Sequence, residues 1–427
     1  MKHCFFICWL LVGYLKTVAQ PNGFISIRQQ QMEYQGKPYR FIGANYWYGA
    51  LLYAQPGGAK RLQAELDFLQ SKGVNNLRIL AAVEGSGIIH GKTRVEPSLQ
   101  NSPDQFNEAF LVGLDYLLQQ LQQRKMHAVL YLSNNWEWSG GFLQYLNWNG
   151  RLPDSVLARP LSWDAYRDYV SGFYSCNSCI QQYAKQLSTI INRTNSFTHR
   201  RYVDDPAIMA WEIANEPRPM RPAAIAAYTT WISNMSAAIR MFDPHHLITI
   251  GSEGDMGSET MDVFEAIHRL PNIDYATIHI WPKNWSWFQD TAIVAGFPAV
   301  LEKTAGYIQR HEAAARRIGK PLVIEEFGLP RDAHAFTVTS STTMRNRYYA
   351  FIFDQWWQSI RQSGPIAGVN FWSFAGSGRP TGKQLFWQQG NDWIGDPPVE
   401  EQGLNSVFDS DTDTWQLIES YTKKLKQ

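Results

Sequence analysis

Short apolar runs rich in β-branched residues recur along the chain, and longer segments whose apolar positions have helical spacing separate them. A short apolar run bounded by turn residues is typical of a buried strand, whereas apolar positions three and four residues apart indicate a helix. The clearest helical segments lie at 59–73, 106–125, 228–242 and 300–319. The apolar runs predict strands at residues 39–45, 74–80, 127–133, 208–214, 246–251, 275–281, 321–327 and 367–373.

The regular alternation of strand and helix predicts an α/β protein. No Pro-, Ser- or Gly-rich linker divides the chain, so we expect one domain over 20–427, a (β/α)8 TIM barrel. Residues 24–45 alternate like a hairpin that feeds the first buried strand. A doubly wound sheet is the competing fold. It usually carries a glycine-rich phosphate loop after its first strand, and FIGANYWYG contains no G-x-G-x-x-G.

The first twenty residues have the pattern of a secretory signal. Lys2 and His3 precede an apolar run from Cys4 to Tyr14, and Ala19 marks a small-residue cleavage position. The run is shorter than the roughly 20 residues that a membrane-spanning helix needs. We therefore expect a signal peptide at 1–19, cleaved near Ala19, and a secreted protein in the periplasm or outside the cell.

Composition narrows the classes of partner. The 39 basic and 38 acidic residues nearly cancel, so the chain lacks the field that would hold nucleic acid. Aromatic residues reach 14%, including 17 Trp, and such apolar content excludes disorder, coiled coil and collagen. Seventeen indoles exceed the needs of core packing. We expect some of them to face a ligand.

Two cysteines remain after the predicted signal, Cys176 and Cys179. A lone C-x-x-C can be a local disulfide, half of a metal site or a redox pair. Zinc would require a second pair of Cys or nearby His, and the surrounding sequence offers neither. We favour a local disulfide or two free thiols.

The residues at the predicted strand ends carry most of the chemical information, because (β/α)8 barrels place their chemistry at the carboxyl ends of the strands. Carboxylates, amides and indoles dominate these positions. They are Asn45–Tyr48, Arg78, Asn134–Trp138, Asn215–Glu216, Glu253, His279–Trp281, Glu325–Glu326 and Trp372.

Two of these strand ends offer carboxylates on strands that face each other across a barrel. Glycoside hydrolysis needs one carboxylic acid to protonate the leaving oxygen and one carboxylate to attack or to activate water. Because side chains alternate along a strand, we expect that Glu325 and Glu326 do not both point inward. For Glu212 and Glu325 we favour pairing with arginine at the barrel rim. Glu216, held before a proline, is the stronger chemical candidate.

The motifs around these carboxylates resemble the retaining glycoside hydrolases of family 5, in the cellulase superfamily. Asn215-Glu216-Pro217 and Glu326-Phe327-Gly328 carry the resemblance. The longer segments DDPAIMAWEIANEPR, SNNW and GDPPVEEQGLNSVFDSD are similar to its endo-β-1,4-mannanase branch. The resemblance covers essentially residues 21–420.

The resemblance implies a role for each matching residue. It makes Glu216 the acid/base and Glu326 the nucleophile. Arg78 would orient and ionise Glu326, lowering its pKa, while the negative neighbour keeps the pKa of Glu216 raised. Asn215 would bond to the sugar 2-hydroxyl, and His279 would line the −1 subsite. Trp372 would be the stacking platform beneath the sugar in that subsite, and Arg218 would reach toward the leaving-group subsites.

One position departs from the family pattern. The sixth strand ends His279-Ile280-Trp281, where the family usually has His-x-Tyr and the phenol bonds to the nucleophile. An indole N–H can donate as a phenol does, but it is bulkier and cannot accept. Trp47, Asn135 and Trp136 are further candidates for contact with substrate. The loop tryptophans expected to wall a cleft are Trp47, Trp136, Trp138, Trp281, Trp285, Trp287 and Trp387.

The resemblance implies retaining endo-hydrolysis of β-1,4-mannosidic bonds in mannan, glucomannan or galactomannan. An endo-β-1,4-glucanase, an exo-acting β-mannosidase and a glycan-binding protein without catalysis remain alternatives. The segment 375–400 decides whether the cleft is open or blocked. Since acid, nucleophile and water suffice for the reaction, we expect no cofactor and no metal. The expected partner is a β-mannan polysaccharide, with neither nucleic acid nor membrane, and we expect a monomer.

Overall fold

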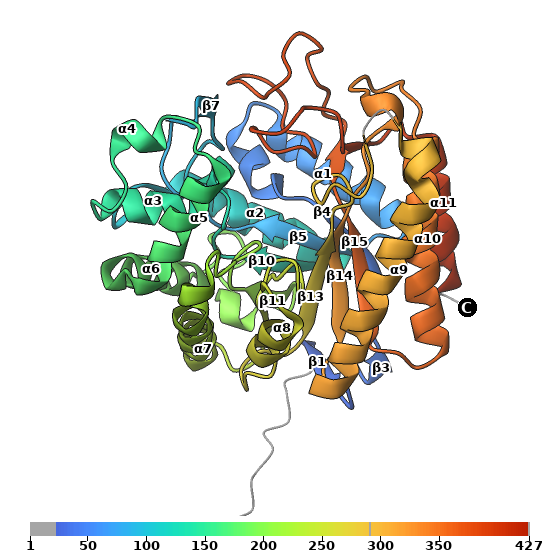
Figure 1. Ribbon diagram of the computed structural model, residues 1–427, viewed down its shortest axis with the longest axis horizontal. Coiled ribbons are helices and arrows are strands. Elements are labelled where there is room, and N and C mark those ends of the chain that lie inside the picture. The colour runs from blue at the N-terminus through green and yellow to red at the C-terminus, as the bar shows by residue number, and fades with distance from the viewer. Residues whose placement is uncertain (1–22, 290–291, 426–427) are drawn as a thin grey trace, which may run out of the picture.

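A barrel of eight parallel strands forms the centre of the molecule (Figure 1). The computed structural model describes residues 23–289 and 292–425. Neighbouring strands in the sheet follow the order β12-β11-β10-β5-β4-β15-β14-β13. The strands are β4 (Phe41–Asn45), β5 (Asn76–Leu80), β10 (His127–Tyr131), β11 (Ile208–Glu212), β12 (Leu247–Thr249), β13 (Ala276–Ile280), β14 (Leu322–Phe327) and β15 (Ile366–Phe371).

The two end strands of this sheet are also joined. The backbone N–H of Asp274 donates to the carbonyl of Ile248 at 2.8 Å, and the Thr249 hydroxyl donates to the carbonyl of Tyr275 at 3.0 Å. These bonds bring β12 beside β13 and close the barrel. The predicted (β/α)8 fold and all eight predicted strands are confirmed.

Helices cover the outside of the barrel, and the four predicted helical segments are confirmed as α1, α2, α7 and α9. Their ends follow local rules. In α2 the Asn107 side chain accepts from the N–H of Ala109, and Lys125 ends the helix in a left-handed conformation. The helices are α1 (Gly58–Ser71), α2 (Glu108–Arg124), α3 (Gly141–Trp148), α4 (Asp154–Leu157), α5 (Trp163–Ser171), α6 (Asn177–Ile191), α7 (Ile225–Phe242), α8 (Met261–His268), α9 (Ile293–Ile318), α10 (Thr343–Arg361) and α11 (Thr412–Lys424).

A small antiparallel sheet closes one end of the barrel. It consists of β1 (Ile25–Arg28), β2 (Gln31–Tyr34) and β3 (Lys37–Pro38), so the predicted hairpin is present with a third strand added. Its apolar residue Met32 is fully buried in a cluster with Met209 and Val323 of the barrel. Figure 1 shows β1 and β3 at the end of the molecule opposite the long connecting loops.

The long loops at the other end carry short elements of their own. Two hairpins, β6–β7 and β8–β9, follow β5, and β16 pairs with β17 near the end of the chain. The short strands are β6 (Ile88–Ile89), β7 (Lys92–Thr93), β8 (Gln100–Ser102), β9 (Gln105–Phe106), β16 (Phe374–Gly376) and β17 (Val407–Phe408). The 3-10 helices are η1 (Gly49–Ala54), η2 (Glu137–Ser139), η3 (Gly172–Ser175), η4 (Tyr202–Asp204), η5 (Pro222–Ala224) and η7 (Asp332–His334).

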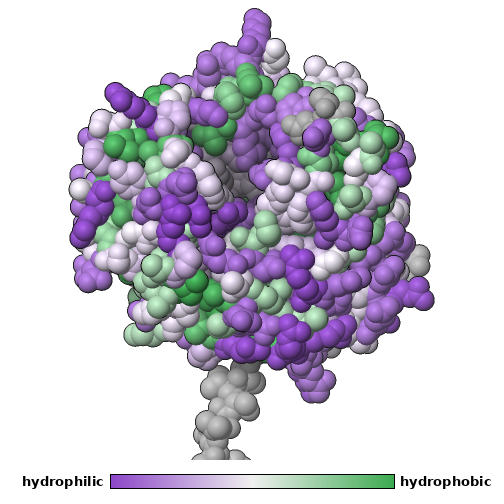
Figure 2. Space-filling view, viewed as in Figure 1, coloured by the Kyte–Doolittle hydropathy of each residue, from purple (hydrophilic) through white to green (hydrophobic). Residues whose placement is uncertain are grey.

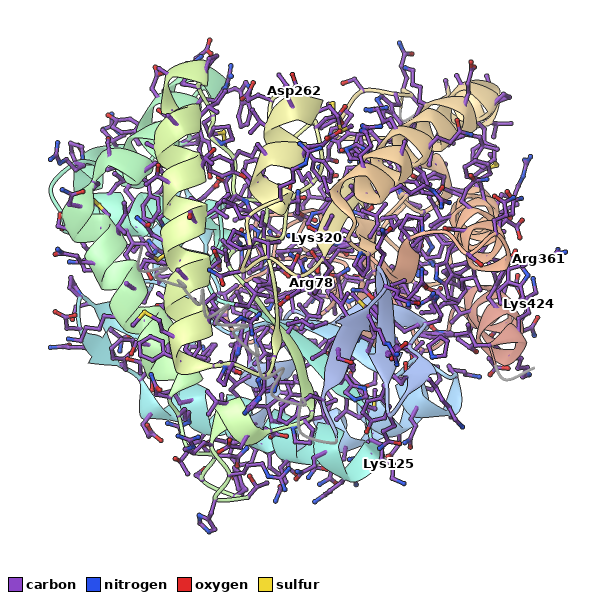
Figure 3. The ribbon with its side chains drawn as sticks, turned by 90° about the horizontal axis from the view of Figure 1, so that it is seen from below. Arg78, Lys125, Asp262, Lys320, Arg361 and Lys424 are labelled. Atoms are coloured by element: carbon purple, nitrogen blue, oxygen red, sulfur yellow. A yellow bond between two sulfur atoms is a disulfide. The ribbon has the colours of Figure 1, made fainter. Side chains whose placement is uncertain are left out.

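Charged residues are distributed very unevenly between the surface and the barrel. Lys125 and Arg361 are exposed at the periphery, whereas Arg78 lies at the centre with no exposed surface (Figure 3). A buried arginine needs several partners, so its position marks the region where carboxylates must gather.

Two predictions concern the chain outside the barrel. Cys176 and Cys179 form a disulfide at the start of α6, with their Cα atoms 5.2 Å apart, which confirms one of the two favoured states. The predicted signal at 1–19 lies outside the described residues. Within 23–289 and 292–425, none of the helices has the length and apolarity needed to cross a membrane.

Candidate active site

A cavity of about 700 Å³ opens at the carboxyl ends of the barrel strands. Figure 2 shows the corresponding hollow in the surface, beneath the long loops. Its size suits a few sugar rings. The lining residues are Trp136, Glu137, Trp138, Trp163, Asn215, Glu216, Arg218, Glu253, Trp281, Lys283, Asn284, Trp285, Glu326, Trp372, Phe386, Val399, Glu400, Glu401, Leu404 and Asn405.

Glu216 reaches this cavity from the turn after β11. Its backbone is left-handed, with φ of +49°, a region that residues with a side chain rarely adopt. Two backbone bonds hold the turn: Asn215 N–H donates to the carbonyl of Ser133 and Glu216 N–H donates to the carbonyl of Gly251, both at 2.9 Å. The strained conformation aims the carboxyl into the cavity.

Glu326, at the end of β14, lies against the buried guanidinium of Arg78. Arg78 Nη1 donates to Glu326 Oε1, so the predicted contact between them is present. The same guanidinium donates to Glu212 from Nε at 2.8 Å and to Asn215 Oδ1 from Nη2 at 2.7 Å. One arginine therefore connects the ends of β5, β11 and β14.

The prediction that Glu325 and Glu326 do not both point inward is wrong. Glu325 Oε2 lies 3.7 Å from Arg78 Nε and 3.5 Å from His279 Nε2, while Glu326 contacts the same arginine from its other side. The register shifts at this point, between Ile278 and His279 and between Ile324 and Phe327. Such an irregularity breaks the strict alternation of side chains. The favoured pairing of Glu212 and Glu325 with arginine is confirmed.

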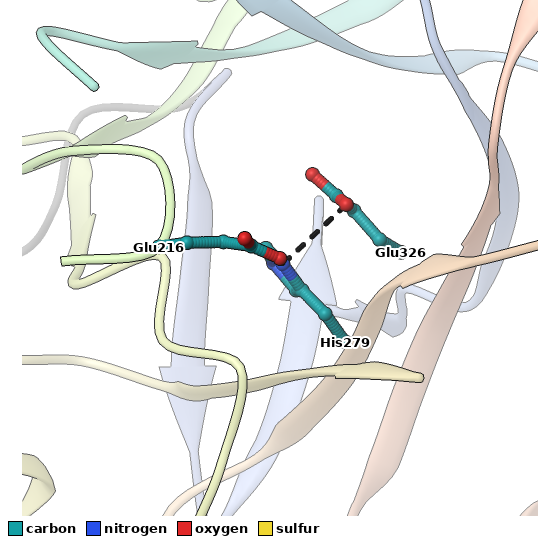
Figure 4. A group of neighbouring side chains, drawn as sticks. All are labelled: Glu216, His279 and Glu326. Atoms are coloured by element: carbon teal, nitrogen blue, oxygen red, sulfur yellow. Dashed lines mark hydrogen bonds and ion pairs between the residues drawn. The ribbon is translucent and has the colours of Figure 1, made fainter. Parts of the chain in front are cut away.

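His279 stands between the two candidate carboxyls (Figure 4). Its Nδ1 lies 2.6 Å from Glu216 Oε1 and 3.5 Å from Glu326 Oε2. One ligand atom from each of the three side chains falls within 4.8 Å of the others. The carboxyls are therefore close to the roughly 5–5.5 Å separation typical of retaining glycoside hydrolases.

Burial dominates the electrostatics of this pair. It raises the pKa of both Glu216 and Glu326 and lowers the pKa of His279 to about 4, so the imidazole is neutral. Arg78 opposes the rise at Glu326 without cancelling it, which corrects the expected net lowering. Two carboxyls this close retain one proton between them. The bond from Arg78 favours the ionised form of Glu326, which is the division of charge that an acid at Glu216 would require.

Trp281 stands where the family usually has tyrosine, and it donates the hydrogen bond to Glu326 that the phenol would donate. The indole Nε1 donates to Glu326 Oε2 at 3.0 Å. Gly328 makes room for the ring, because a Cβ at that position would lie 2.7 Å from Trp281 Cζ3. Trp372 packs edge-on against Trp281, with centroids 5.7 Å apart, and forms part of the cavity wall.

The wall on the Glu216 side is aromatic and carries a second arginine. Trp136 Nε1 donates to Glu216 Oε2 at 2.5 Å, and the Arg218 guanidinium lies 5.0 Å from the Trp136 ring centroid. Glu253 Oε1 accepts from Arg218 Nη2 at 2.6 Å. Trp163, which the sequence analysis did not single out, stacks on Trp136 with 51% of its surface exposed. Its helical setting on α5 gave no signal of a strand end.

Some predicted contact residues lie behind the wall instead. Trp47 is fully buried, touches Trp138 edge-on and donates its N–H to the carbonyl of Gly395 at 2.9 Å, so it packs the wall. Asn135 is also fully buried. Its neighbour Asn134 accepts from Asn215 Nδ2 at 3.0 Å. Of the proposed wall tryptophans, Trp287 contacts Tyr307 and Trp387 stacks on Trp393.

The segment 379–405 overlaps the loop 375–400, which was predicted to open or block the cleft, and it contributes several residues to the cavity lining. Glu400 lines the cavity, and burial raises its pKa to about 8. Glu401 Oε2 pairs with Lys283 Nζ at 3.2 Å, and Lys92 Nζ donates to the carbonyl of Val399 at 3.0 Å. These contacts tie the segment to the loops after β13 and β5.

The trio of Glu216, His279 and Glu326 also has the spacing of a metal site. The donors around it argue against that use. Arg78 and the Trp281 N–H already bond to Glu326, and the Trp136 N–H bonds to Glu216. A cation would compete with these donors and with the guanidinium charge. The arrangement suits an acid–carboxylate pair.

Comparison with known proteins agrees with this geometry. A family described as GH family 5 beta-mannosidase-like matches residues 22–427. Mannan endo-1,4-beta-mannosidase 7 of Arabidopsis thaliana is 28% identical over 384 residues, covering 87% of this chain and 81% of the relative. The glycoside hydrolase family 5 mannosidase of Rhizomucor miehei superposes with a TM-score of 0.85 at 31% identity, covering 95% and 98% of the two chains. The endo-1,4-beta-mannanase of the same fungus, at 22% identity and a TM-score of 0.66, covers 94% and 99% and shares the fold.

Proposed function

The chain belongs to the β-mannosidase-like group of glycoside hydrolase family 5 and is a glycoside hydrolase, and we propose that it hydrolyses β-1,4-mannosidic bonds inside mannan, glucomannan or galactomannan. The observation that carries the proposal is the close pair of buried carboxyls, Glu216 and Glu326, one of them held by Arg78. The relative named as a mannan endo-1,4-beta-mannosidase supports the substrate class, and the solved family 5 mannosidase supports mannose as the sugar.

In the proposed reaction, Glu326 attacks the anomeric carbon while Glu216 gives its proton to the departing glycosidic oxygen. This forms a glycosyl ester on Glu326 and releases the leaving chain. Glu216, now ionised, removes a proton from water, which attacks the anomeric carbon and frees Glu326. Configuration is retained because the anomeric carbon is inverted twice.

The surrounding side chains hold the sugar and the charges. Asn215 bonds to the 2-hydroxyl at the reacting ring, and Trp372 gives that ring an apolar platform. His279, neutral because of its lowered pKa, keeps the Glu216 carboxyl in place. On the other side of the scissile bond, Arg218, Trp136 and Trp163 receive the leaving chain. Trp281 takes the tyrosine role through its N–H.

The direct test measures reducing-sugar release from galactomannan by the wild type and by Glu326→Ala. We expect the substitution to remove activity by several orders of magnitude, because no other group can form the ester. Full activity in Glu326→Ala would refute the assignment of the nucleophile. Proton NMR of the first product gives the second readout, since a retaining enzyme releases the β-anomer first.

One observation favours a second mode of attack, an exo-acting β-mannosidase. The segment 379–405 forms part of the cavity wall and is held by Lys92 and by the Lys283–Glu401 pair. A wall there leaves room for a chain end better than for a continuous chain. Products from mannohexaose separate the two modes: mannose appears first from an exo enzyme, and di- and trisaccharides from an endo enzyme. Glu401→Gln, which weakens the wall, should shift products toward longer fragments.

We also propose where the protein is located and how it is assembled. Residues 1–19 act as a signal peptide removed near Ala19, the mature protein is secreted, and it works as a monomer. Amino-terminal sequencing of the exported protein and light scattering at micromolar concentration test these points. An intact Met1 in the mature protein, or a dimer mass, would contradict them.

A further inference from the structure

A second pocket, of about 330 Å³, lies outside the catalytic cavity. It is bounded by the β6–β7 hairpin and by α3 and α4, which Figure 1 shows grouped at one side of the barrel. The backbone N–H of His90 donates to the carbonyl of Leu157 at 3.0 Å and joins the hairpin to α4. The lining residues are Gly85, Ser86, Ile88, Arg94, Asn101, Gln144, Asn147, Trp148, Asp154, Leu157 and Ala158.

Arg94 in the wall of this pocket is a buried cation with one unpaired donor. Only 2% of it is exposed, and burial lowers its pKa to about 10, which still leaves it charged at neutral pH. Its Nη1 donates to neutral acceptors, the Glu84 carbonyl at 3.0 Å and Gln144 Oε1 at 2.6 Å. Its Nε is buried and has no hydrogen-bond partner among the described residues. Buried arginines normally have their donors satisfied, so Arg94 brings an incompletely paired cation to the wall of this pocket.

A chain of side-chain hydrogen bonds fixes the polar groups of the pocket. From Gln144, which Arg94 holds, Nε2 donates to Asn147 Oδ1 at 3.0 Å, and Asn147 Nδ2 donates to Asp154 Oδ1 at 2.7 Å. The chain has a donor cation at one end and an acceptor carboxylate at the other. A hydroxyl-rich ligand can accept from the first and donate to the second, whereas an anion would be repelled by Asp154.

Apolar side chains provide the other half of the lining. Trp148 is half-buried, and Ile88 on the hairpin is 56% exposed. Sugar rings present C–H faces to aromatic and aliphatic surface while their hydroxyls bond to fixed polar groups. Apolar surface beside a fixed donor–acceptor pair therefore matches a saccharide better than a phosphate or a peptide.

We propose that this pocket is an accessory saccharide site that binds one hexose unit of the polysaccharide, a backbone mannose or a galactose branch. The proposal rests on the proposed function for the class of ligand. Binding at two places on one molecule raises the effective concentration of the polymer at the catalytic cavity. Substrates too short to reach both places gain nothing from it.

The experiment compares Asp154→Asn with Asp262→Asn, since both residues are exposed acids in the first turn of a helix and only Asp154 lines the pocket. We expect Asp154→Asn to lower kcat/KM on galactomannan roughly three- to tenfold, the effect of one hydrogen bond, and to leave kcat/KM on an aryl β-mannoside unchanged. Asp262→Asn should change neither. Trp148→Ala, with its melting temperature checked, should reproduce the selective loss.

Affinity electrophoresis through galactomannan gives a readout that needs no catalysis. In the Glu326→Gln background, adding Asp154→Asn should reduce retardation, and adding Asp262→Asn should not. Equal retardation in both, or equal kinetics on polymer and aryl substrate, would overturn the accessory site. Protection of the melting temperature by inorganic phosphate, abolished by Arg94→Gln, would overturn the saccharide assignment in favour of an anion. If the wild type cleaved neither substrate, the proposed function would fail while the electrophoresis still tested the pocket.

Discussion

The two walls of the catalytic cavity use the same residue types under opposite conditions. On the nucleophile wall, Arg78 has no exposed side-chain surface and bonds to Glu326 and Glu212. On the acid wall, the Arg218 side chain is 17% exposed, bonds to Glu253 and lies over Trp136 at the cavity surface. Indoles follow the same division: Trp281 donates to Glu326, the proposed nucleophile, whereas 51% of Trp163 is exposed.

The difference in burial distinguishes side chains that hold a charged group in place from side chains that are free to contact a ligand. A guanidinium removed from water must satisfy its donors within the protein, so Arg78 holds the barrel ends in one arrangement. An arginine at a cavity surface keeps donors available for a ligand, and an exposed indole face stays free to stack. Substitutions of Arg78 and Trp281 should therefore affect chemistry and folding, whereas those of Arg218 and Trp163 should affect long substrates more than short ones.

The largest contrast is expected between two neighbours on the nucleophile wall. Glu326→Gln should lose several orders of magnitude in kcat, because an amide cannot form the glycosyl ester. Glu325→Gln keeps the reacting group and loses weaker contacts with Arg78 and His279, at 3.7 and 3.5 Å. We expect a loss of about tenfold, the cost of one hydrogen bond. Steady-state rates on an aryl β-mannoside measure both, and equal losses would remove the distinction between the two carboxylates.

The next comparison replaces each arginine by lysine. Arg78→Lys keeps the charge but loses the fork that bonds to Glu212 and Glu326 together. We expect the free energy of unfolding to fall by about 3 kcal/mol, because buried carboxylates lose their partner. Arg218→Lys loses one of two bonds to a single carboxylate, Glu253, and should cost less, about 1.5 kcal/mol. Urea unfolding measures both variants, and equal destabilisation would mean that the two walls do not differ in this way.

The sequence predicts the fold, and the meeting of Glu216 and Glu326 in one cavity, because both depend on local signals. Buried strands need continuous apolar runs, and the NEP and EFG motifs each keep their residues within three positions. It predicts less well what depends on register and on distant contacts. Alternation along β14 suggested one inward glutamate, but the register shift beside Ile324 brings both to Arg78. Trp47 follows a strand end as predicted, and yet the segment near Gly395 covers it.

The comparison of the two walls can also be tested at a single hydrogen bond, the one that Trp281 donates to Glu326. Burial raises the pKa of Glu326 and the Trp281 N–H opposes that rise, so Trp281→Phe removes an opposing donor while keeping an aromatic ring. The pKa of Glu326 should then rise. Since attack requires the ionised form, the acid limb of the kcat/KM–pH profile should move to higher pH. Gly328→Ala, which crowds the same indole, should move the limb in the same direction. A shift to lower pH would contradict the donor role.

The smallest effect is expected at Trp163 on the acid wall. Trp163→Ala removes a stacking face next to Trp136, so chains that extend past the scissile bond should bind less well. We expect kcat/KM on mannopentaose to fall roughly three- to tenfold, in line with about 1 kcal/mol for one aromatic contact. An aryl β-mannoside, which has no leaving chain, should react as before. Trp357→Ala on α10, at a partly buried tryptophan that is not among the residues lining the cavity, is the control. If both substrates lost activity equally, Trp163 would belong with the residues that maintain the site rather than with those that receive the chain.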